Sequence, residues 1–218
     1  MILNHRRESA SKDYEGDSNC PDCAGTLIAK CGEIKIHHWA HATSPPNCEY
    51  QPKTEWHMGW QLKFPLDWLE VKYTNGRADV MLPKGDLVEF QSKGLDSETL
   101  KRRTEGTKPG AIAWVVDGRE AFKEERLYLT KGLKEFNDNH PSPFFFSFRW
   151  IHSPNWFYQH VGILLVDIGN DKLLDIRHLY KGPPVRGWGQ VHTHDDFLAL
   201  CKRDESLNFV YSRVMVHP

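Results

Sequence analysis

Long hydrophobic runs are missing from this chain of 218 residues. No apolar stretch approaches the roughly 20 residues that a transmembrane helix needs. The first ten residues, MILNHRRESA, also lack the apolar segment that follows the basic residues of a signal peptide. These absences predict a soluble, cytoplasmic protein that makes no contact with a membrane.

An excess of one charge is missing as well. The formal net charge is -1 and the sequence pI is near 6.9, so no global positive field indicates a nucleic-acid partner. Short basic clusters are present at residues 5–7 and 101–103. Hydrophobic residues make up 39% and charged residues 26%, which is ordinary for a globular protein and excludes a disordered one. Charge therefore argues neither for nor against nucleic acid.

Internal repeats and low-complexity tracts are absent, and cysteine is scarce. Four of the five cysteines lie before residue 50. In a chain without an export signal, the pair Cys20 and Cys23 favours metal binding or redox chemistry over a disulfide. Residues 18–48 contain only the short apolar runs LIA and IKI, so this segment needs a cross-link or a metal to fold.

The cysteines and histidines of this segment have the spacing of a tetrahedral zinc site. The predicted ligands are Cys20, Cys23, His41 and Cys48. His38 competes with His41 for one position, and Cys31, within the expected hairpin AKCGEIKI, is predicted to be a half-buried thiol instead. Four protein ligands leave no open position, which indicates structural zinc. Zinc-dependent redox or hydrolytic chemistry at Cys20 and Cys23 is an alternative that requires a reactive thiolate or an open position.

Residues 53–117 read as a helix, three strands, a helix and a strand. Trp56, Trp60 and Phe64 share one face of a helix over 53–64. The runs DWLEVKYT, RADVML and LVEFQS are separated by turn residues and predict three strands. A helix over 95–106 with Asp96 or Ser97 as N-cap and the buried strand AIAWVVD follow. The predicted class is mixed α/β (α+β), with an αβββαβ core.

The remaining residues predict a β-rich module. Phe144, Phe146, Phe148 and Trp150 alternate along one strand, a pattern more typical of core than of a base-stacking surface. A hairpin is expected around residues 169–171, and Thr193 and Asp196 have capping-box spacing before a helix. LNFVYSRVMV is expected to close the chain as a strand. The expected modules are 1–52, 53–125 and 126–218, and no site is assigned to the last.

Three acidic residues in the core segment predict a metal site. Asp79 and Glu89 lie on consecutive predicted strands, where cross-strand neighbours come within about 5 Å, and Glu55 lies on the first helix. Hard divalent cations held by carboxylates assist phosphodiester hydrolysis, so Mg²⁺ or Mn²⁺ is the expected ion. Gln91 would position the attacking water, and Lys93 is the nearest cation along the strand.

Strand carboxylates are often merely solvated, so spacing alone is a weak argument. Asp79 lies between Ala78 and Val80, and Glu89 lies between Val88 and Phe90. Both carboxylates thus interrupt apolar strands, where solvated faces show Lys or Thr more often. This pattern favours a site.

Several separated motifs resemble the competence protein CoiA-like family, whose nuclease domain is a PD-(D/E)XK variant. The resemblance covers roughly residues 18–117. It rests on the strings CPDCAGTLIAKCGEIKIHHWAH, TEWHMGW, RADV and EFQSKGLDSETLKRR, with Cys48 between the first two.

The resemblance implies a restriction-endonuclease-like fold with Glu55, Asp79, Glu89 and Gln91 in the active site. EFQ stands where most enzymes of the superfamily carry Glu-X-Lys, and a neutral amide cannot act as a general base. Arg103 matches a family arginine that supports the site or touches phosphate, although an exposed helix arginine explains it equally well. His57 has a catalytic interpretation and a packing one.

These observations predict a divalent-metal-dependent deoxyribonuclease acting on single-stranded or duplex DNA. The resemblance implies a role in DNA uptake and recombination, and a mobile-element or defence role is equally compatible. The alternative from another class is a nucleic-acid-binding module with structural zinc whose nuclease site is inactive.

Overall fold

In the computed structural model the chain forms two compact units. The first comprises Met1–Lys72 and Arg77–Met81, and the second comprises Tyr73–Gly76 and Leu82–Pro218. The structure describes residues 8–15, 18–43, 48, 53–74, 76–92, 94–105, 111–131, 145–154, 162–203, 206–207 and 214–217. Among these residues, no helix is long and apolar enough to cross a membrane.

The first unit begins with a small two-stranded sheet. Strands β1 (Leu27–Lys30) and β2 (His38–His41) pair antiparallel, with Leu27 opposite His41. Trp39 is buried, and its indole N–H donates to the carbonyl of Glu8 at 2.9 Å. The hydrophobic cluster around Trp39 is small, so burial alone supplies little stability here.

The expected hairpin AKCGEIKI is wrong in its second strand. Ile34 is 95% exposed and lies in the turn, and HWAH forms β2 instead. The physical reason is that HWAH contributes Trp39 to the cluster and IKI contributes no buried side chain. Cys31 is half-buried and packs against the same cluster, as predicted.

The predicted first helix is confirmed as α1 (Glu55–Gln61). Thr54 caps it, because the Thr54 hydroxyl accepts the backbone N–H of His57 at 3.3 Å. Trp56, Trp60 and Phe64 are all buried, which confirms the predicted apolar face. A 3-10 helix, η1 (Leu66–Trp68), leads to the neighbouring strands β3 (Leu69–Tyr73) and β4 (Gly76–Met81).

The second unit begins with β5 (Leu87–Gln91), α2 (Ser97–Glu105) and β6 (Ile112–Asp117), and β5 and β6 pair parallel. Asp96 is the N-cap of α2, since its carboxylate accepts the N–H of Thr99 at 2.8 Å. This hydrogen bond also lowers the pKa of Asp96. The predicted order of helix, three strands, helix and strand is confirmed, and so is the mixed α+β class.

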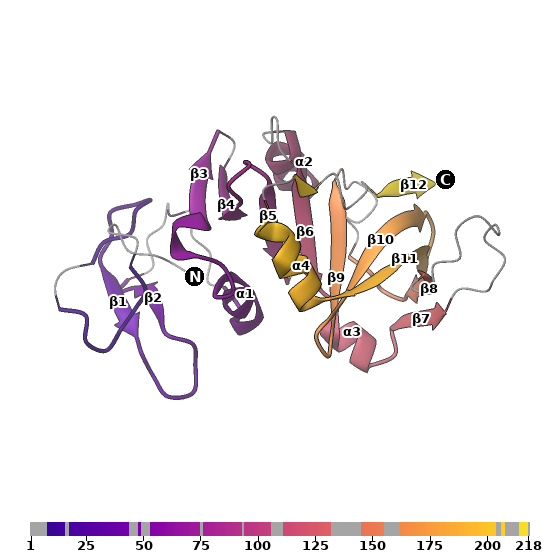
Figure 1. Cartoon of the computed structure of the whole chain (residues 1–218). Coiled ribbons are helices and arrows are strands. Elements are labelled where there is room, and N and C mark those ends of the chain that lie inside the picture. Colours follow the sequence, from indigo (N-terminus) through magenta and orange to yellow (C-terminus); the bar gives the residue numbers. More distant parts are fainter. Residues whose placement is uncertain are drawn as a thin grey trace. The chain divides into compact units, whose positions relative to one another are not determined.

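The carboxy-terminal strands extend the sheet of the second unit. In chain order the further elements are α3 (Arg119–Lys123), β7 (Leu127–Lys131), β8 (Phe145–Trp150), β9 (Ile163–Gly169), β10 (Lys172–Tyr180), β11 (Val185–Thr193), α4 (His194–Cys201) and β12 (Met215–His217). The described strands run β5-β6-β9-β10-β11-β8-β7, with β12 against β10. Strand β9 pairs parallel with β6, so the sheet is continuous across the junction between the predicted core and the β-rich module (Figure 1). The division at 52 and 125 stays a prediction.

The hairpin predicted around residues 169–171 is confirmed. The β9–β10 turn has Asn170 and Asp171 at φ 50° and 60°, the left-handed pair of a two-residue hairpin. On β8, Phe148 and Trp150 are buried as predicted and Phe146 is half-buried, whereas Phe144 lies outside the described residues. Gly187 lies opposite Phe148, and a Cβ there would come within 2.0 Å of the His178 carbonyl. Of the expected closing strand, residues 208–213 lie outside the described residues.

The capping box of α4 allows a first test of the fold. The Thr193 hydroxyl accepts the N–H of Asp196 at 3.0 Å, and the Asp196 carboxylate accepts the N–H of Thr193 at 3.0 Å. We expect Thr193→Ala to lower the free energy of unfolding by about 1 kcal/mol, because the backbone N–H of Asp196 loses the hydroxyl that accepts it. Urea denaturation measures this. Thr193→Ser is the control that keeps the hydroxyl, and equal losses in both variants would contradict the capping role.

Candidate functional site

The first candidate site is a cluster of three cysteines and one histidine in the first unit. Its members are Cys20, Cys23, His41 and Cys48, whose ligand atoms all lie within 4.8 Å of one another. The thiols of Cys20 and Cys48 are 3.8 Å apart, and Cys23 Sγ lies 3.3 Å from Nε2 of His41. A tetrahedral ion with Zn–S bonds of about 2.3 Å requires S–S separations of about 3.8 Å. The cluster could therefore hold zinc.

The backbone around the cysteine pair is shaped for such an ion. The Cys20 N–H donates to the carbonyl of Gly25 at 2.8 Å, and the Ala24 N–H donates to the carbonyl of Cys20 at 2.9 Å. A Cβ at Gly25 would lie 3.2 Å from Cys23 Sγ, so glycine keeps the space beside the thiol. A backbone hydrogen bond from Gly25 lowers the pKa of Cys23, and this favours the thiolate that metal binding requires.

The competition between the two histidines is decided by their positions. His41 lies in the cluster, whereas Nδ1 of His38 lies 2.8 Å from the carbonyl oxygen of Ile36. Among the described residues, Cys31 is not part of the ligand set, as predicted. Four protein ligands would fill a tetrahedral shell and leave no open coordination position. This argues for structural zinc and against zinc-dependent chemistry at Cys20 and Cys23.

The cysteine turn is tied to the strands that carry the second candidate site. The Asp22 carboxylate, between the two turn cysteines, forms ion pairs with Arg77 of β4 and, at 3.0 Å, with Lys72 of β3. Arg77 is largely buried. Because all three residues belong to the first unit, folding of the cysteine turn supports the two strands directly.

The second candidate site surrounds Asp79 of β4. This carboxylate is 7% exposed and contacts Lys53, which precedes the cap of α1, and His57 on the helix. Nε2 of His57 lies 2.9 Å from Oδ1 of Asp79 and 3.0 Å from Nζ of Lys53. The Lys53 ammonium also forms an ion pair with Glu70 of β3, which is 5% exposed. Two buried carboxylates thus share one cation.

The electrostatics of this cluster favour the charged forms of Lys53 and Asp79. Burial alone would lower the pKa of Lys53, but Asp79 and Glu70 outweigh it and raise the pKa above its ordinary value. Burial would raise the pKa of Asp79, but Lys53 and His57 hold it well below its usual range. Burial lowers the pKa of His57, and the attraction of Asp79 does not outweigh burial and Lys53.

Gln61 and the backbone of Glu70 complete the geometry. The fully buried Gln61 amide donates to Oε1 of Glu70 at 2.6 Å and to the backbone carbonyl of Asp79 at 3.2 Å. Glu70 has φ 52°, a left-handed conformation that a non-glycine residue rarely adopts. Such conformations persist where the surroundings hold them and concentrate at functional sites. Here Lys53 and Gln61 hold the carboxylate.

The other predicted site residues that the structure describes are Glu55, Glu89, Gln91 and Arg103. Glu89 of β5 is 1% exposed, and its Oε2 accepts from Nη1 of Arg103 of α2 at 2.5 Å. Arg103 is thus an ion-paired helix residue that supports Glu89. Gln91 ends β5 half-buried, and Glu55 begins α1 with an exposed side chain. Lys93 lies outside the described residues.

Asp79 and Glu89 belong to different units, so their convergence on one ion stays a prediction. The sequence analysis missed Lys53, Gln61 and Glu70. For Glu70 the sequence offered one signal. In the strand sequence LEVKY its carboxylate lies between the apolar residues Leu69 and Val71.

A known family model matches the segment that contains the cysteine cluster. Residues 3–51 match the family model described as Competence protein CoiA, N-terminal domain. The amino-terminal segment is therefore CoiA-like. All four candidate zinc ligands fall within the matched residues of this CoiA-like segment, so the resemblance predicted from the motifs is confirmed there. No curated protein and no solved structure matches the chain significantly.

Proposed function

We propose that the chain is a divalent-metal-dependent nuclease that hydrolyses phosphodiester bonds in DNA, in a competence-related process. The observation that carries the proposal is the buried Asp79 carboxylate, which shares a cation with the buried Glu70. Buried carboxylates are costly unless a cation compensates them, and hard divalent ions are bound by such oxygen atoms. The CoiA-like segment supports the link to competence.

The proposed roles follow from the chemistry of each side chain. When bound, Mg²⁺ or Mn²⁺ would supply charge neutralisation at the phosphate and a more acidic water. Asp79 and Glu89 would hold the ion, Arg103 would orient the Glu89 carboxylate through their ion pair, and Gln91 would orient the water by hydrogen bonding. Glu55, exposed at the start of α1, would complete the shell of the metal or of the water.

Lys53 takes the cationic role that the EFQ motif lacks in this proposal. It is the described lysine that contacts Asp79, and it reaches that carboxylate from the residue before the cap of α1 rather than from β5. Its ammonium group would neutralise charge beside the scissile phosphate. It would also hold Glu70 and Asp79 together before the divalent ion binds. The role of Lys93 stays a separate prediction.

The test is cleavage of end-labelled single-stranded and duplex DNA with and without Mg²⁺ or Mn²⁺. We expect Asp79→Asn and Glu89→Gln each to lower the cleavage rate by about 10²–10⁴-fold, since several kcal/mol of transition-state stabilisation is lost. Asp195→Asn, an exposed carboxylate in the first turn of α4, is the matched control. Omitting the divalent ion is preferable to EDTA, which would also remove zinc.

Two results would contradict the nuclease. Cleavage that survives in both site variants would place the activity elsewhere or in a contaminant. A parent protein that binds DNA but cuts neither substrate with either ion would favour the inactive nucleic-acid-binding module. Circular dichroism and zinc content of each variant establish that it is folded.

A further inference from the structure

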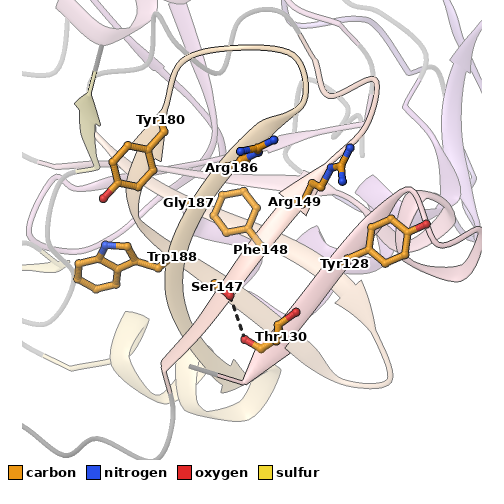
Figure 2. Close-up of a pocket in the computed structure, with 9 residues that line it drawn as sticks. All are labelled: Tyr128, Thr130, Ser147, Phe148, Arg149, Tyr180, Arg186, Gly187 and Trp188. Atoms are coloured by element: carbon orange, nitrogen blue, oxygen red, sulfur yellow. Dashed lines mark hydrogen bonds between the residues drawn. The ribbon is translucent and has the colours of Figure 1, made fainter. Parts of the chain in front are cut away.

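The carboxy-terminal strands of the second unit carry an exposed face of aromatic rings and arginines. Four side chains from four adjacent strands form one cross-strand row. Tyr128 of β7 pairs with Arg149 of β8, Arg149 pairs with Arg186 of β11, and Arg186 pairs with Tyr180 of β10. With strands about 4.8 Å apart, the row spans about 14 Å. Figure 2 shows the two tyrosines at its ends and the two arginines between them.

The row faces solvent and its reverse side is core. Tyr128 is 45% exposed and Tyr180 is 42% exposed, and both arginines are exposed. The residues that flank the row on the reverse side are buried, including Leu127, Trp150 and Val185. The sheet thus presents aromatic rings and guanidinium groups outward on a stable base.

The charge on this face is positive. Of the nine residues that line a shallow pocket of about 430 Å³ on it, two are arginines and none is acidic. Among the described residues, neither Arg149 nor Arg186 forms an ion pair. Like charges placed directly opposite each other across two strands repel. An anion bound between the two guanidinium groups would remove this repulsion.

Further rings adjoin the row. Trp188, one pleat along β11 from Arg186, stacks on His178 with centroids 4.1 Å apart, and Tyr180 stacks on His217 at 4.9 Å. Ser147 and Thr130, on the same side as Trp188, are exposed and offer hydroxyl groups. The face therefore combines flat rings, cations and hydrogen-bonding groups over four strands.

We propose that this face, defined by Tyr128, Arg149, Arg186, Tyr180 and Trp188, binds single-stranded DNA. Unpaired bases stack on exposed aromatic rings, and the backbone phosphates between them match the two arginines. Four-stranded sheets with exposed rings hold two or three bases in this manner. A duplex has no free base faces, and an acidic polypeptide would use the arginines but not the rings. The choice of DNA over RNA rests on the proposed function, whereas the binding mode does not.

The experiment measures fluorescence anisotropy of a labelled oligothymidylate at several salt concentrations, with zinc-loaded protein and no other divalent ion. We expect Tyr128→Ala and Tyr180→Ala each to weaken binding about tenfold, and Tyr→Phe at either position to restore it. Arg149→Gln and Arg186→Gln are each expected to reduce the slope of log K against log salt by about 0.7. Arg203→Gln, an exposed arginine outside the face, is the control.

The same titrations test the alternative ligands, which are duplex DNA and RNA. Equal affinity for a duplex of the same length would overturn single-strand binding, and tighter binding of the matching RNA would overturn the choice of DNA. Alanine variants that bind like the parent would remove the face from the interaction. The titrations are repeated with the Asp79→Asn variant, in which cleavage is expected to be lost. The affinities for single-stranded DNA are expected to be the same in this variant and in the parent protein. Binding by this face can therefore be established even if the nuclease proposal fails.

Discussion

Removal of zinc is expected to unfold the amino-terminal part of the first unit. Among the residues of this segment that the structure describes, the buried apolar side chains are Ala10, Cys20, Leu27 and Trp39. These are too few to offset the entropy of ordering some 30 residues at roughly 1–2 kcal/mol each. A structural zinc ion contributes about 10–16 kcal/mol in small zinc-binding peptides. Metal binding would therefore be the main source of stability here.

The measurement combines zinc content with hydrogen exchange. The parent protein is expected to contain one zinc per chain. A chelator is expected to raise the exchange rates of the amides of Ala24, Leu27 and Ala42, which are hydrogen-bonded in the structure. Cys23→Ser and His41→Ala are expected to lose zinc. The matched controls are Cys31→Ser and His38→Ala, which replace the same residue types outside the cluster.

Two outcomes would contradict the zinc site. If Cys31→Ser lost as much zinc as Cys23→Ser, the ligand set would be wrong. If the purified protein held no metal and these amides were still protected, the segment would fold without zinc. Loss of zinc is also expected to weaken the ion pairs of Asp22 with Lys72 and Arg77, since the cysteine turn positions Asp22.

Lys53→Met is expected to lower the free energy of unfolding by about 3–5 kcal/mol, because it leaves the buried Asp79 and Glu70 carboxylates facing each other without their shared cation. The Lys53 side chain is only 12% exposed, so water does not replace the lost charge easily. Urea denaturation is the measurement. Lys12→Met, at an exposed lysine of the same unit, is expected to change the value by less than about 0.5 kcal/mol.

The stability of the Lys53→Met variant in the presence of a divalent metal ion provides a second test. If Asp79 lies at the proposed divalent-metal site, Mn²⁺ is expected to stabilise Lys53→Met by about 2.7 kcal/mol at 100 times its dissociation constant. Asp79→Asn in the same background is expected to abolish this gain. A variant that is as stable as the parent, or one that Mn²⁺ leaves unchanged, would contradict the proposed cation site.

The features that the sequence analysis recovered are local ones. The helix over Trp56 and Trp60, the N-cap at Asp96, the hairpin at Asn170 and Asp171 and the capping box at Thr193 each depend on side chains within a few residues of one another. The candidate zinc ligands were also identifiable, because a pair of cysteines with two intervening residues restricts the geometry before any tertiary contact forms. The exception was β2, where burial of Trp39 outweighed the apolar run IKI.

The Asp79 cluster could be predicted only in part. Asp79 itself stands out as a carboxylate in an apolar strand, but its partners Lys53, Gln61 and Glu70 come from other elements. Their convergence requires α1 to lie on β3 and β4, and it requires a left-handed backbone at Glu70 that strand alternation does not suggest. The spacing of residues along the chain indicates neither the packing of α1 on these strands nor the left-handed backbone at Glu70.

The sequence by itself determined the kinds of element, their order, the CoiA-like cysteine segment and the candidate zinc ligands, apart from the choice of His41 over His38. Tertiary structure decided that choice, the partners of Asp79, and the alignment of Tyr128 and Arg149 with Arg186 and Tyr180. The physical reason is range. Periodicity, capping and ligand spacing act over a few residues, whereas the pairing of β7 with β8, and of β8 with β11, depends on register between strands distant in the chain.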